Sequence, residues 1–342
     1  MPLNNPLTLK TYPMTKEDLK IVFFGTPEFA VESLNALVEG GFNVAAVVTM
    51  PDKPAGRGKK LSMSAVKQYA LSKNLPLLQP ERLKDEEFVN TLREINADLF
   101  IVIAFRMLPE VVWSMPPMGT FNLHGSLLPK YRGAAPINRA IMAGETETGV
   151  TTFFLKHEID TGDIISREVI EVGPDEDAGS VHDRLMEIGA RLTVQTVNDI
   201  IEGNLRTVPQ DELLQGQEPT PAPKIFKEDC RIDWNRDAGT IHNHVRGLAP
   251  YPAAWSALTL GGEDGPELTT VKVLRTSRDV PENVGHIEPG HLSLIHNHAY
   301  VGTLTTPLEL ITVQPAGKRP MAAADFLRGI RPDQNGRIPA LK

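Results

Sequence analysis

The stretches Leu99-Phe-Ile-Val-Ile-Ala104 and Gly119-Thr-Phe-Asn-Leu-His124 decide the fold class of this chain. Both are almost entirely apolar, which is typical of parallel strands that are buried on both faces of a sheet. Comparable apolar runs stand at 21–24, 44–48 and 150–155, and helical patterns separate them at 28–39 and 64–73. Because strand–helix–strand crossovers are right-handed, this alternation predicts an α/β fold with a Rossmann-like doubly wound parallel sheet.

A proline-rich segment divides the rest of the chain. Before it, 163–171 alternates as an outer strand would, and 178–202 is one long amphipathic helical pattern that ends at Gly203. Residues 204–224 contain four prolines and few apolar residues, so they are interpreted as a linker.

Residues 225–342 predict a second, smaller domain. Helical patterns weaken there, and short strands alternate with Gly and Pro turns, which favours a β-barrel of the OB type. The strands are expected at 255–260, 269–275, 292–295, 299–304 and 308–313, with a short helix at about 321–328. The predicted organisation is an N-terminal extension at 1–18 with Met14 as an alternative start, a catalytic domain at 19–203, a linker at 204–224 and a barrel at 225–342.

Composition limits the function classes. With 342 residues, 41% hydrophobic and 23% charged, the chain has ordinary values for a two-domain globular protein. No apolar run approaches the roughly 18 residues of a membrane span. The single cysteine, Cys230, allows neither an intrachain disulfide nor a thiolate zinc cluster, so the cytoplasm is the expected compartment. The pairs His242/His244 and His296/His298 lack clustered carboxylates, and we expect no metal.

The densest chemical signal is the segment from Phe121 to Pro136. Asn122 and His124 lie two residues apart at the end of a predicted strand, so they project to the same side. An amide can stabilise an oxyanion and an imidazole can move a proton near neutral pH, a combination suited to acyl transfer. The alternative is a structural histidine, which the density of Gly and Pro after His124 disfavours.

An acidic loop follows between two predicted strands, in His157-Glu-Ile-Asp-Thr-Gly-Asp163. A carboxylate from this loop would hold the imidazole of His124 in one tautomer. Spacing alone does not separate Asp160 from Asp163 as that partner.

A basic loop at 51–61 is the third signal. It carries Lys53, Arg57, Lys59 and Lys60 among two glycines and two prolines, a composition that suits a phosphate backbone. The net charge of −8 excludes a generally basic nucleic-acid coat, so any such contact depends on local patches like this one. A solvated basic loop is the alternative. Pro27 replaces the second glycine of the dinucleotide fingerprint after the first strand, which argues against NAD and FAD.

Together these segments resemble the methionyl-tRNA formyltransferase family over roughly residues 20–330. The Asn-x-His and Asp set is shared by the wider group of transferases that use 10-formyltetrahydrofolate. The basic loop and the C-terminal segments are more specific to the family. The resemblance rests on Phe24-Gly-Thr-Pro-Glu-Phe29, Pro51–Leu61, Asn122–Pro129, Arg132-Gly-Ala-Ala-Pro-Ile137, Ile159-Asp-Thr-Gly-Asp163, Arg231-Ile-Asp-Trp234 and Gln314-Pro-Ala-Gly-Lys318.

The resemblance implies that the formyl group of 10-formyltetrahydrofolate passes to the α-amino group of initiator methionyl-tRNA, for translation initiation. It implies that Asn122 stabilises the oxyanion, that His124 assists the proton transfers and that Asp160 orients His124. From the residues themselves we expect no metal and no membrane contact, and we also expect a monomer. The folate pocket would be shaped by Ser126, Leu127, Leu128 and Pro129, and tRNA would be bound by Lys53, Arg57, Lys59, Lys60 and the barrel.

One departure bears on the folate pocket. Phe105-Arg-Met107 follows the apolar strand where the family commonly has Tyr-Gly. Two other readings stay open: an amino-sugar formyltransferase with the same catalytic domain, and a non-catalytic RNA-binding protein that keeps the fold. The basic loop and the barrel disfavour the first, and the intact Asn122, His124 and Asp160 disfavour the second.

Overall fold

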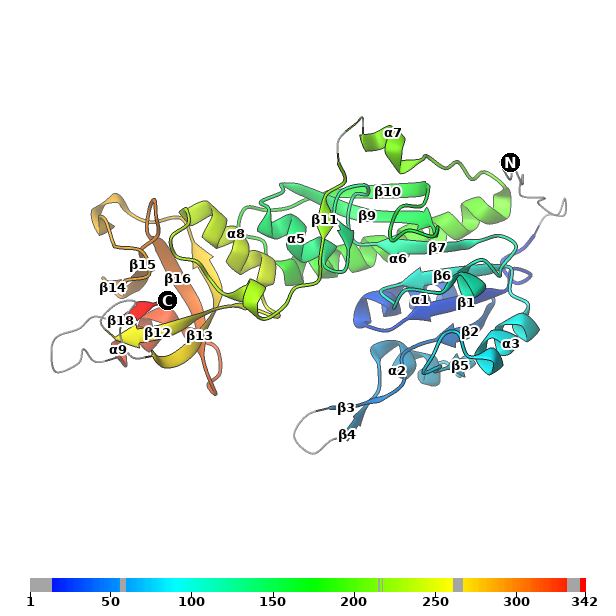
Figure 1. Cartoon of the computed structure of the whole chain (residues 1–342), viewed down its shortest axis with the longest axis horizontal. Coiled ribbons are helices and arrows are strands. Elements are labelled where there is room, and N and C mark those ends of the chain that lie inside the picture. Colours follow the sequence, from blue (N-terminus) through cyan, green and yellow to red (C-terminus); the bar gives the residue numbers. More distant parts are fainter. Residues whose placement is uncertain (1–13, 56–59, 215, 217, 261–266, 331–338) are drawn as a thin grey trace. The chain divides into compact units, whose positions relative to one another are not determined.

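The computed structural model describes residues 14–55, 60–214, 216, 218–260, 267–330 and 339–342. Its N-terminal part is built on one sheet, which confirms the predicted Rossmann-like class (Figure 1). The strands lie in the order β10-β9-β7-β6-β1-β2-β5. Their bounds are β1 Ile21–Gly25, β2 Val44–Val48, β5 Leu77–Leu78, β6 Leu99–Ile103, β7 Thr120–His124, β9 Glu147–Phe154 and β10 Ile164–Glu171.

The direction of one strand differs from the prediction. Strands β5, β2, β1, β6 and β7 pair in parallel, whereas β9 pairs with β7 antiparallel, with Phe121 opposite Phe154. The expectation that 150–155 continues the parallel sheet is therefore wrong. An apolar run indicates burial on both faces but carries no information on strand direction, and mixed sheets with some antiparallel strands are common.

Helices cover both faces of this sheet. On one face, Phe24 and Phe100 pack with Phe88 and Leu92 of α3. On the other face, the Thr152 hydroxyl of β9 lies 2.9 Å from that of Thr196 in α6. The helices of this part are α1 Glu28–Glu39, α2 Ala65–Ser72, α3 Glu86–Ile95, α4 Glu110–Trp113 and α6 Ala178–Glu202, whereas α5 Pro136–Met142 belongs to the other compact unit.

The C-terminal part is an antiparallel barrel, as predicted. Its strands lie in the order β14-β15-β16-β13-β12-β18, and β17 pairs with β16. A bridge between His291 and Ala340 brings the two ends of this sheet together. The elements are β12 Ala254–Leu260, β13 Glu267–Ser277, β14 Leu292–Ile295, β15 His298–Val301, β16 Leu308–Pro315, β17 Met321–Ala322, α9 Ala323–Arg328 and β18 Pro339–Leu341, with 3₁₀ turns at Glu228–Cys230 and Glu282–Val284.

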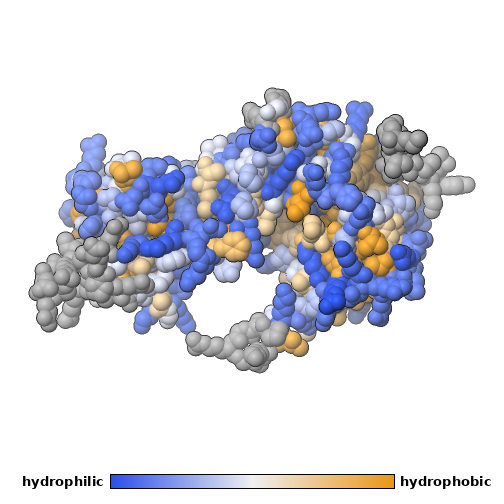
Figure 2. All heavy atoms as spheres, in the orientation of Figure 1, coloured by the Kyte–Doolittle hydropathy of each residue, from blue (hydrophilic) through white to orange (hydrophobic). Residues whose placement is uncertain are grey.

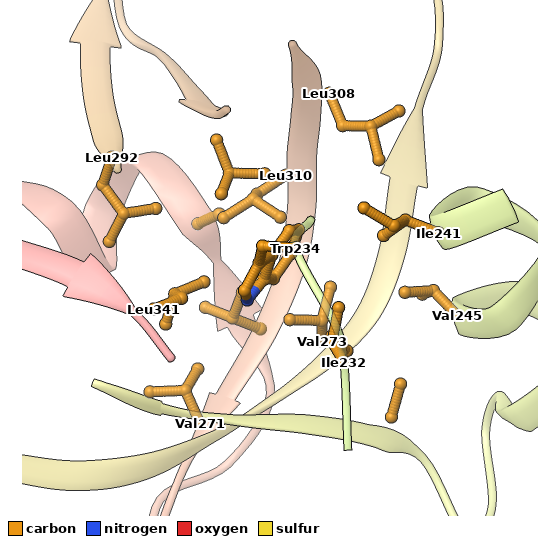
Figure 3. Close-up of a cluster of buried hydrophobic side chains, with 14 of the residues drawn as sticks. Ile232, Trp234, Ile241, Val245, Val271, Val273, Leu292, Leu308, Leu310 and Leu341 are labelled. Carbon is orange, nitrogen blue, oxygen red and sulfur yellow. The ribbon is translucent and has the colours of Figure 1, made fainter. Parts of the chain in front are cut away.

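Helix α8 (Ala238–Leu248) lies where helical signals were expected to fade. The Asp237 side chain caps it by accepting from Thr240 N at 2.9 Å. Its Ile241 and Val245 enter the buried cluster around Trp234, as Figure 3 shows. His242 and His244 therefore lie two apart on a helix rather than on a strand, so they do not face one site. No group of three potential metal-ligating side chains occurs among the described residues.

The segment predicted as a linker carries two short elements, α7 (Gln210–Leu214) and β11 (Pro221–Ala222). Strand β11 pairs with β8 (Arg132–Gly133). By internal contacts, one unit comprises the chain up to Gly133, Gly149–Ile170 and His182–Pro221, and the other comprises Ala134–Thr148, Glu171–Val181 and Ala222–Lys342. Each compact unit is made of three separate ranges of the chain and so does not correspond to one continuous segment. The predicted domain boundaries therefore stay expectations.

The visible surface is mostly hydrophilic, with small separate apolar patches (Figure 2). Among the described helices, none combines the length and the apolar character that crossing a membrane requires.

Two histidines of α8, the buried His242 and the half-buried His244, allow a prediction of how the stability of the barrel unit depends on pH. Burial lowers the pKa of both His242 and His244 below the usual 6.5. For His242, Arg246 and Arg278 oppose protonation further, whereas Asp175 and the Pro174 carbonyl favour it. The unfolded chain takes up these protons below about pH 6.5 while the folded chain does not. Stability is therefore highest above that pH and falls below it, by at most about 1.4 kcal/mol per pH unit for each histidine.

We expect His242→Gln to flatten this dependence. The measurement is urea unfolding between pH 7.5 and 5, with His286→Gln, an exposed histidine, as the control. An unchanged slope in His242→Gln would contradict the assignment.

Candidate active site

Strand β7 places Asn122 and His124 as its sequence pattern predicts. His124 is 7% exposed, and its Nε2 donates to the carbonyl oxygen of Tyr131 at 2.9 Å. A carbonyl oxygen only accepts hydrogen bonds, so Nε2 carries the proton and Nδ1 is left to face a second group. The Oδ1 atom of Asn122 is buried and has no hydrogen-bond partner within the part of the chain that the structure describes.

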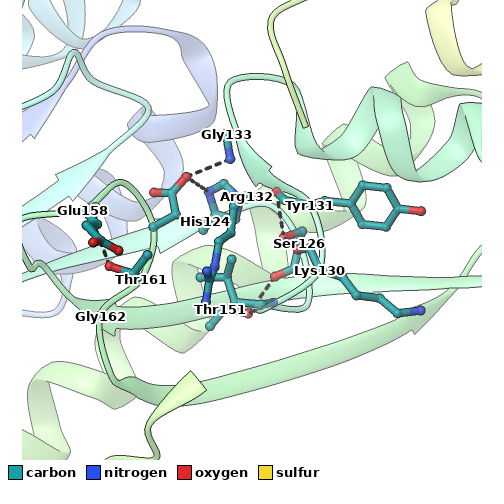
Figure 4. A network of polar contacts seen from close by, with 12 residues as sticks. His124, Ser126, Lys130, Tyr131, Arg132, Gly133, Thr151, Glu158, Thr161 and Gly162 are labelled. Atoms are coloured by element: carbon teal, nitrogen blue, oxygen red, sulfur yellow. Dashed lines mark hydrogen bonds and ion pairs between the residues drawn. The ribbon is translucent and has the colours of Figure 1, made fainter. Parts of the chain in front are cut away.

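The second group is Asp160, in the loop between β9 and β10. Its Oδ2 lies 3.8 Å from Nδ1 of His124 and accepts from the backbone N–H of Gly133 at 2.9 Å (Figure 4). Asp163 instead pairs with Lys156 Nζ at 2.7 Å. The structure thus brings Asp160, and not Asp163, next to the imidazole, which the spacing of the sequence left open.

Close backbone packing holds the Asp160 loop in place. Asp160 has φ +54°, in the left-handed region that residues other than glycine seldom adopt. A Cβ atom on Gly162 would lie 1.5 Å from the carbonyl oxygen of Phe154, so only glycine allows this approach. The Thr161 hydroxyl donates to the Glu158 carbonyl at 3.1 Å.

The segment predicted to shape the folate pocket follows His124. The Ser126 hydroxyl donates to the Lys130 carbonyl at 2.7 Å, and Thr151 Oγ1 donates to the Ser126 carbonyl at 2.6 Å. Leu128 is buried against Phe153 and Ile164. Leu127, which is half-buried, lines a cavity of about 370 Å³ beside β10. These contacts fix the turn that presents the Tyr131 carbonyl to His124. That the side chains of residues 126–129 contact folate directly stays a prediction.

Unpaired polar atoms occur in or shortly after three neighbouring strands. Among the described residues, the buried side-chain atoms without a partner include Thr26 Oγ1, Arg106 Nε and Asn122 Oδ1. Thr26 directly follows β1, Arg106 comes shortly after β6, and Asn122 lies in β7. Strands β1 and β6 flank the point where the strand order reverses, and ligands bind at that point in open α/β sheets. Because an unpaired buried polar atom is destabilising, these three indicate a polar ligand.

A cavity of about 530 Å³ adjoins the segment after β6. Met107, 73% exposed, belongs to its rim, and Arg106 donates to the carbonyl oxygens of Pro80 and Glu81. The walls of the cavity are mostly apolar with a few charged groups, which is typical of small-molecule sites. The lining residues are Leu83, Lys84, Arg106, Met107, Leu108, Pro109, Glu110 and Val111.

The basic segment is a hairpin where a loop was expected. Strands β3 (Lys53–Ala55) and β4 (Lys60–Ser62) pair antiparallel, while Arg57 and Lys59 lie outside the described residues. At the base of the hairpin, Asp52 accepts from Lys67 Nζ at 2.7 Å and from Gln79 Nε2 at 3.1 Å. The hydrogen bond from Lys67, followed by that from Gln79, lowers the pKa of the Asp52 carboxyl below its usual range. The negative charge of Asp52 at the base of the hairpin is thus neutralised by Lys67 within the protein.

Sequence comparison assigns the chain to a family. A formyl transferase profile matches residues 19–197, and a formyl transferase C-terminal domain profile matches 224–331. The methionyl-tRNA formyltransferase of Bacteroides fragilis is 53% identical over 319 residues, covering 92% of this chain and 96% of that protein. The chain belongs to the methionyl-tRNA formyltransferase family. A formyltransferase of the same name from Parabacteroides distasonis is 54% identical over 323 residues, covering 93% of this chain and 98% of its own length.

Solved structures show the same fold as this formyltransferase. WlaRD, a sugar 3N-formyl transferase crystallised with dTDP and 5-N-formyl-THF, aligns with a TM-score of 0.62 at 19% identity, over 88% of this chain and 99% of WlaRD. HypX from Aquifex aeolicus in complex with tetrahydrofolic acid aligns with a TM-score of 0.59 at 19% identity, over 92% of this chain and 48% of HypX.

Three residues of the site were not singled out from the sequence. Thr26 lies in the Gly-Thr-Pro turn directly after β1, and its unpaired hydroxyl becomes visible only in the fold. Arg132 and Gln210 are hydrogen-bonded to each other although they lie 78 residues apart. No local pattern connects a residue of the proline-rich segment with the catalytic loop.

The geometry predicts unequal roles for the two aspartates. We expect Asp160→Asn to lower kcat by about 10²-fold or more, since it removes the charge that faces His124. Asp163→Asn loses only an exposed pair with Lys156 and should retain most activity. Steady-state kinetics of both variants, with folding checked by circular dichroism, provides the comparison. Equal losses would mean that the loop acts only as a whole.

Proposed function

We propose that this protein transfers the formyl group of 10-formyltetrahydrofolate to the α-amino group of initiator methionyl-tRNA. The observation that carries the proposal is the imidazole of His124 between the Tyr131 carbonyl and the Asp160 carboxylate, on the strand that also holds Asn122, in a chain of this family. The donor is proposed to bind in the cavity after β6, with Ser126, Leu127, Leu128 and Pro129 forming the neighbouring turn. The initiator tRNA, rather than an elongator tRNA, is part of the same proposal.

The reaction forms a C–N bond between the formyl carbon and the α-amino nitrogen and breaks the bond to N10 of the folate. Negative charge builds up on the formyl oxygen as the amine attacks. The N–H groups of the half-buried Asn122 amide are suited to stabilise that charge, because an amide held in place on a strand needs little reorganisation. One proton leaves the attacking nitrogen and one is gained by N10, so protons balance.

His124 is the residue best placed to move that proton. Its Nε2–H is held by the Tyr131 carbonyl and its Nδ1 faces Asp160, so the ring cannot turn freely. A proton on Nδ1 is stabilised by the carboxylate, and a 3.8 Å separation leaves room for tightening when substrates bind. A free α-amino group has a pKa of about 8, so a modest base is sufficient.

Binding of tRNA needs local positive charge on a chain of net −8. The basic hairpin with Lys53, Arg57, Lys59 and Lys60 is one such region. A second lies in the barrel unit, where Lys227 and Arg231 are each 5.7 Å from the ring of Trp255. Both cations lie over the ring of this half-buried tryptophan, and exposed cations of this kind suit phosphate contact.

We expect His124→Ala and Asn122→Ala each to lower kcat about 10²- to 10⁴-fold, since each removes a group that acts on the reacting atoms. The KM values for folate and for tRNA should stay near those of the wild type. The assay uses the formyl donor with charged initiator tRNA, and an amino-sugar nucleotide as an alternative acceptor. Near-wild-type turnover of His124→Ala at saturating substrates would refute the assignment, and preference for the sugar would refute the acceptor.

For the hairpin, we expect Arg57→Ala to raise the KM for charged initiator tRNA or to lower kcat with it, because the loss of a phosphate or groove contact weakens binding. Transfer to a small amine should be nearly unchanged. Lys73→Ala, at an exposed pair with Glu39 in the same unit, is the matched control. Equal losses with both acceptors would place Arg57 at the catalytic pocket, and no loss with either would leave the hairpin as a solvated surface.

A further inference from the structure

We propose that Gln210 is a positioning residue of the active site, whose buried side chain holds the Asp160 loop so that its carboxylate faces His124. The proposal rests on the proposed function of that site. Gln210 is the first residue of α7, in the segment that the sequence marks as a linker, and it is 2% exposed.

The carboxamide of Gln210 makes four hydrogen bonds. Its Nε2 donates to the carbonyl oxygen of Asp160 at 2.9 Å and to that of Gly162 at 2.8 Å. Its Oε1 accepts from Nε and Nη2 of Arg132 at 3.0 and 2.8 Å. An amide has two N–H donors and two acceptor lone pairs, so every hydrogen-bonding position of this side chain is used.

This arrangement admits one orientation of the amide. A half-turn would set its N–H groups against the guanidinium and its oxygen against two carbonyl oxygens. The donors are needed where they are, because Asp160 has the strained left-handed φ of +54°. Such a conformation persists only where its surroundings fix it, and the bonds to Asp160 and Gly162 fix both sides of Thr161.

Three consecutive residues complete the link between His124 and Asp160. The Tyr131 carbonyl accepts from His124, the Arg132 side chain binds Gln210, and the Gly133 N–H donates to the Asp160 carboxylate. The histidine and the aspartate are therefore joined through one short segment, and Gln210 connects that segment to the backbone of the Asp160 loop. Removing its donors should let the loop shift relative to the imidazole.

Two variants separate the donors from the rest of the side chain. Gln210→Glu keeps the acceptor for Arg132 but removes both donors, because a carboxylate only accepts. Gln210→Met keeps the length and removes all four bonds. Gln195→Met is the matched control, since Gln195 is exposed and bonds only a side chain on its own helix, Asp199, among the described residues. Melting temperatures verify folding.

We expect both Gln210 variants to lower kcat about 10- to 100-fold, the effect of a small misplacement in a catalytic pair. The KM values for donor and tRNA should change less than about threefold by the same reasoning, since no substrate contact is removed. In both Gln210 variants, the ¹⁵N chemical shifts of the His124 ring should move toward the values that the same ring has in Asp160→Asn. In addition, Asp160→Asn should cost much less in the Gln210→Glu background than in the wild type, because residues that act as a unit are not additive.

Each other outcome is informative. Wild-type kcat in Gln210→Glu, or full additivity with Asp160→Asn, would overturn the proposal while leaving the proposed function intact. Failure of both variants to fold, with a normal Gln195→Met, would assign Gln210 to the stability of the whole unit and overturn it as well. Absence of formyl transfer by the wild type would instead refute the proposed function.

Discussion

The approach of the Asp160 carboxylate to the imidazole of His124 is the interaction on which the site depends. Neither residue is held by its neighbours in sequence. The histidine is fixed by the Tyr131 carbonyl, and the aspartate by the Gly133 N–H and by the close packing of Gly162 on Phe154. The fold supplies these partners from β7, from the turn after it and from the β9–β10 loop, so the pair exists only in the complete N-terminal unit.

Polar groups around this pair fall into two kinds. Ser126, Thr151 and Gln210 have their hydrogen bonds made within the protein, and they make the site rigid. Thr26, Arg106 and Asn122, in or shortly after the inner strands β1, β6 and β7, each keep a buried atom unpaired among the described residues. Unpaired buried groups lower stability, and proteins tolerate them mainly at functional sites. A rigid frame around a few unsatisfied groups is the arrangement expected where a ligand supplies the missing partners.

The sequence predicts those features that local pattern encodes. Apolar runs located β1, β2, β6 and β7, and strand periodicity put Asn122 and His124 on one side. Helix α8 was missed because its two glycines, Gly239 and Gly247, have low helix propensity. Packing of Ile241, Val245 and Leu248 on the barrel core stabilises it instead. The choice between Asp160 and Asp163, and the role of Gln210, depend on contacts between distant segments, which spacing does not carry.

Charge placement explains how a chain of net −8 could still act on a polyanion. The acidic residue at the base of the basic hairpin, Asp52, is neutralised by Lys67 at 2.7 Å, so it does not offset the exposed Lys53 beside it. The attraction between the protein and one phosphate group depends on charges within about a Debye length of that phosphate, roughly 8–10 Å at physiological salt. It does not depend on the net charge of the whole molecule. Distant carboxylates therefore reduce long-range attraction while leaving the contact itself intact. A local basic patch favours selective over non-specific binding of polyanions. Only a ligand that reaches both the patch and the His124–Asp160 pair gains binding energy from the patch and is also placed to react.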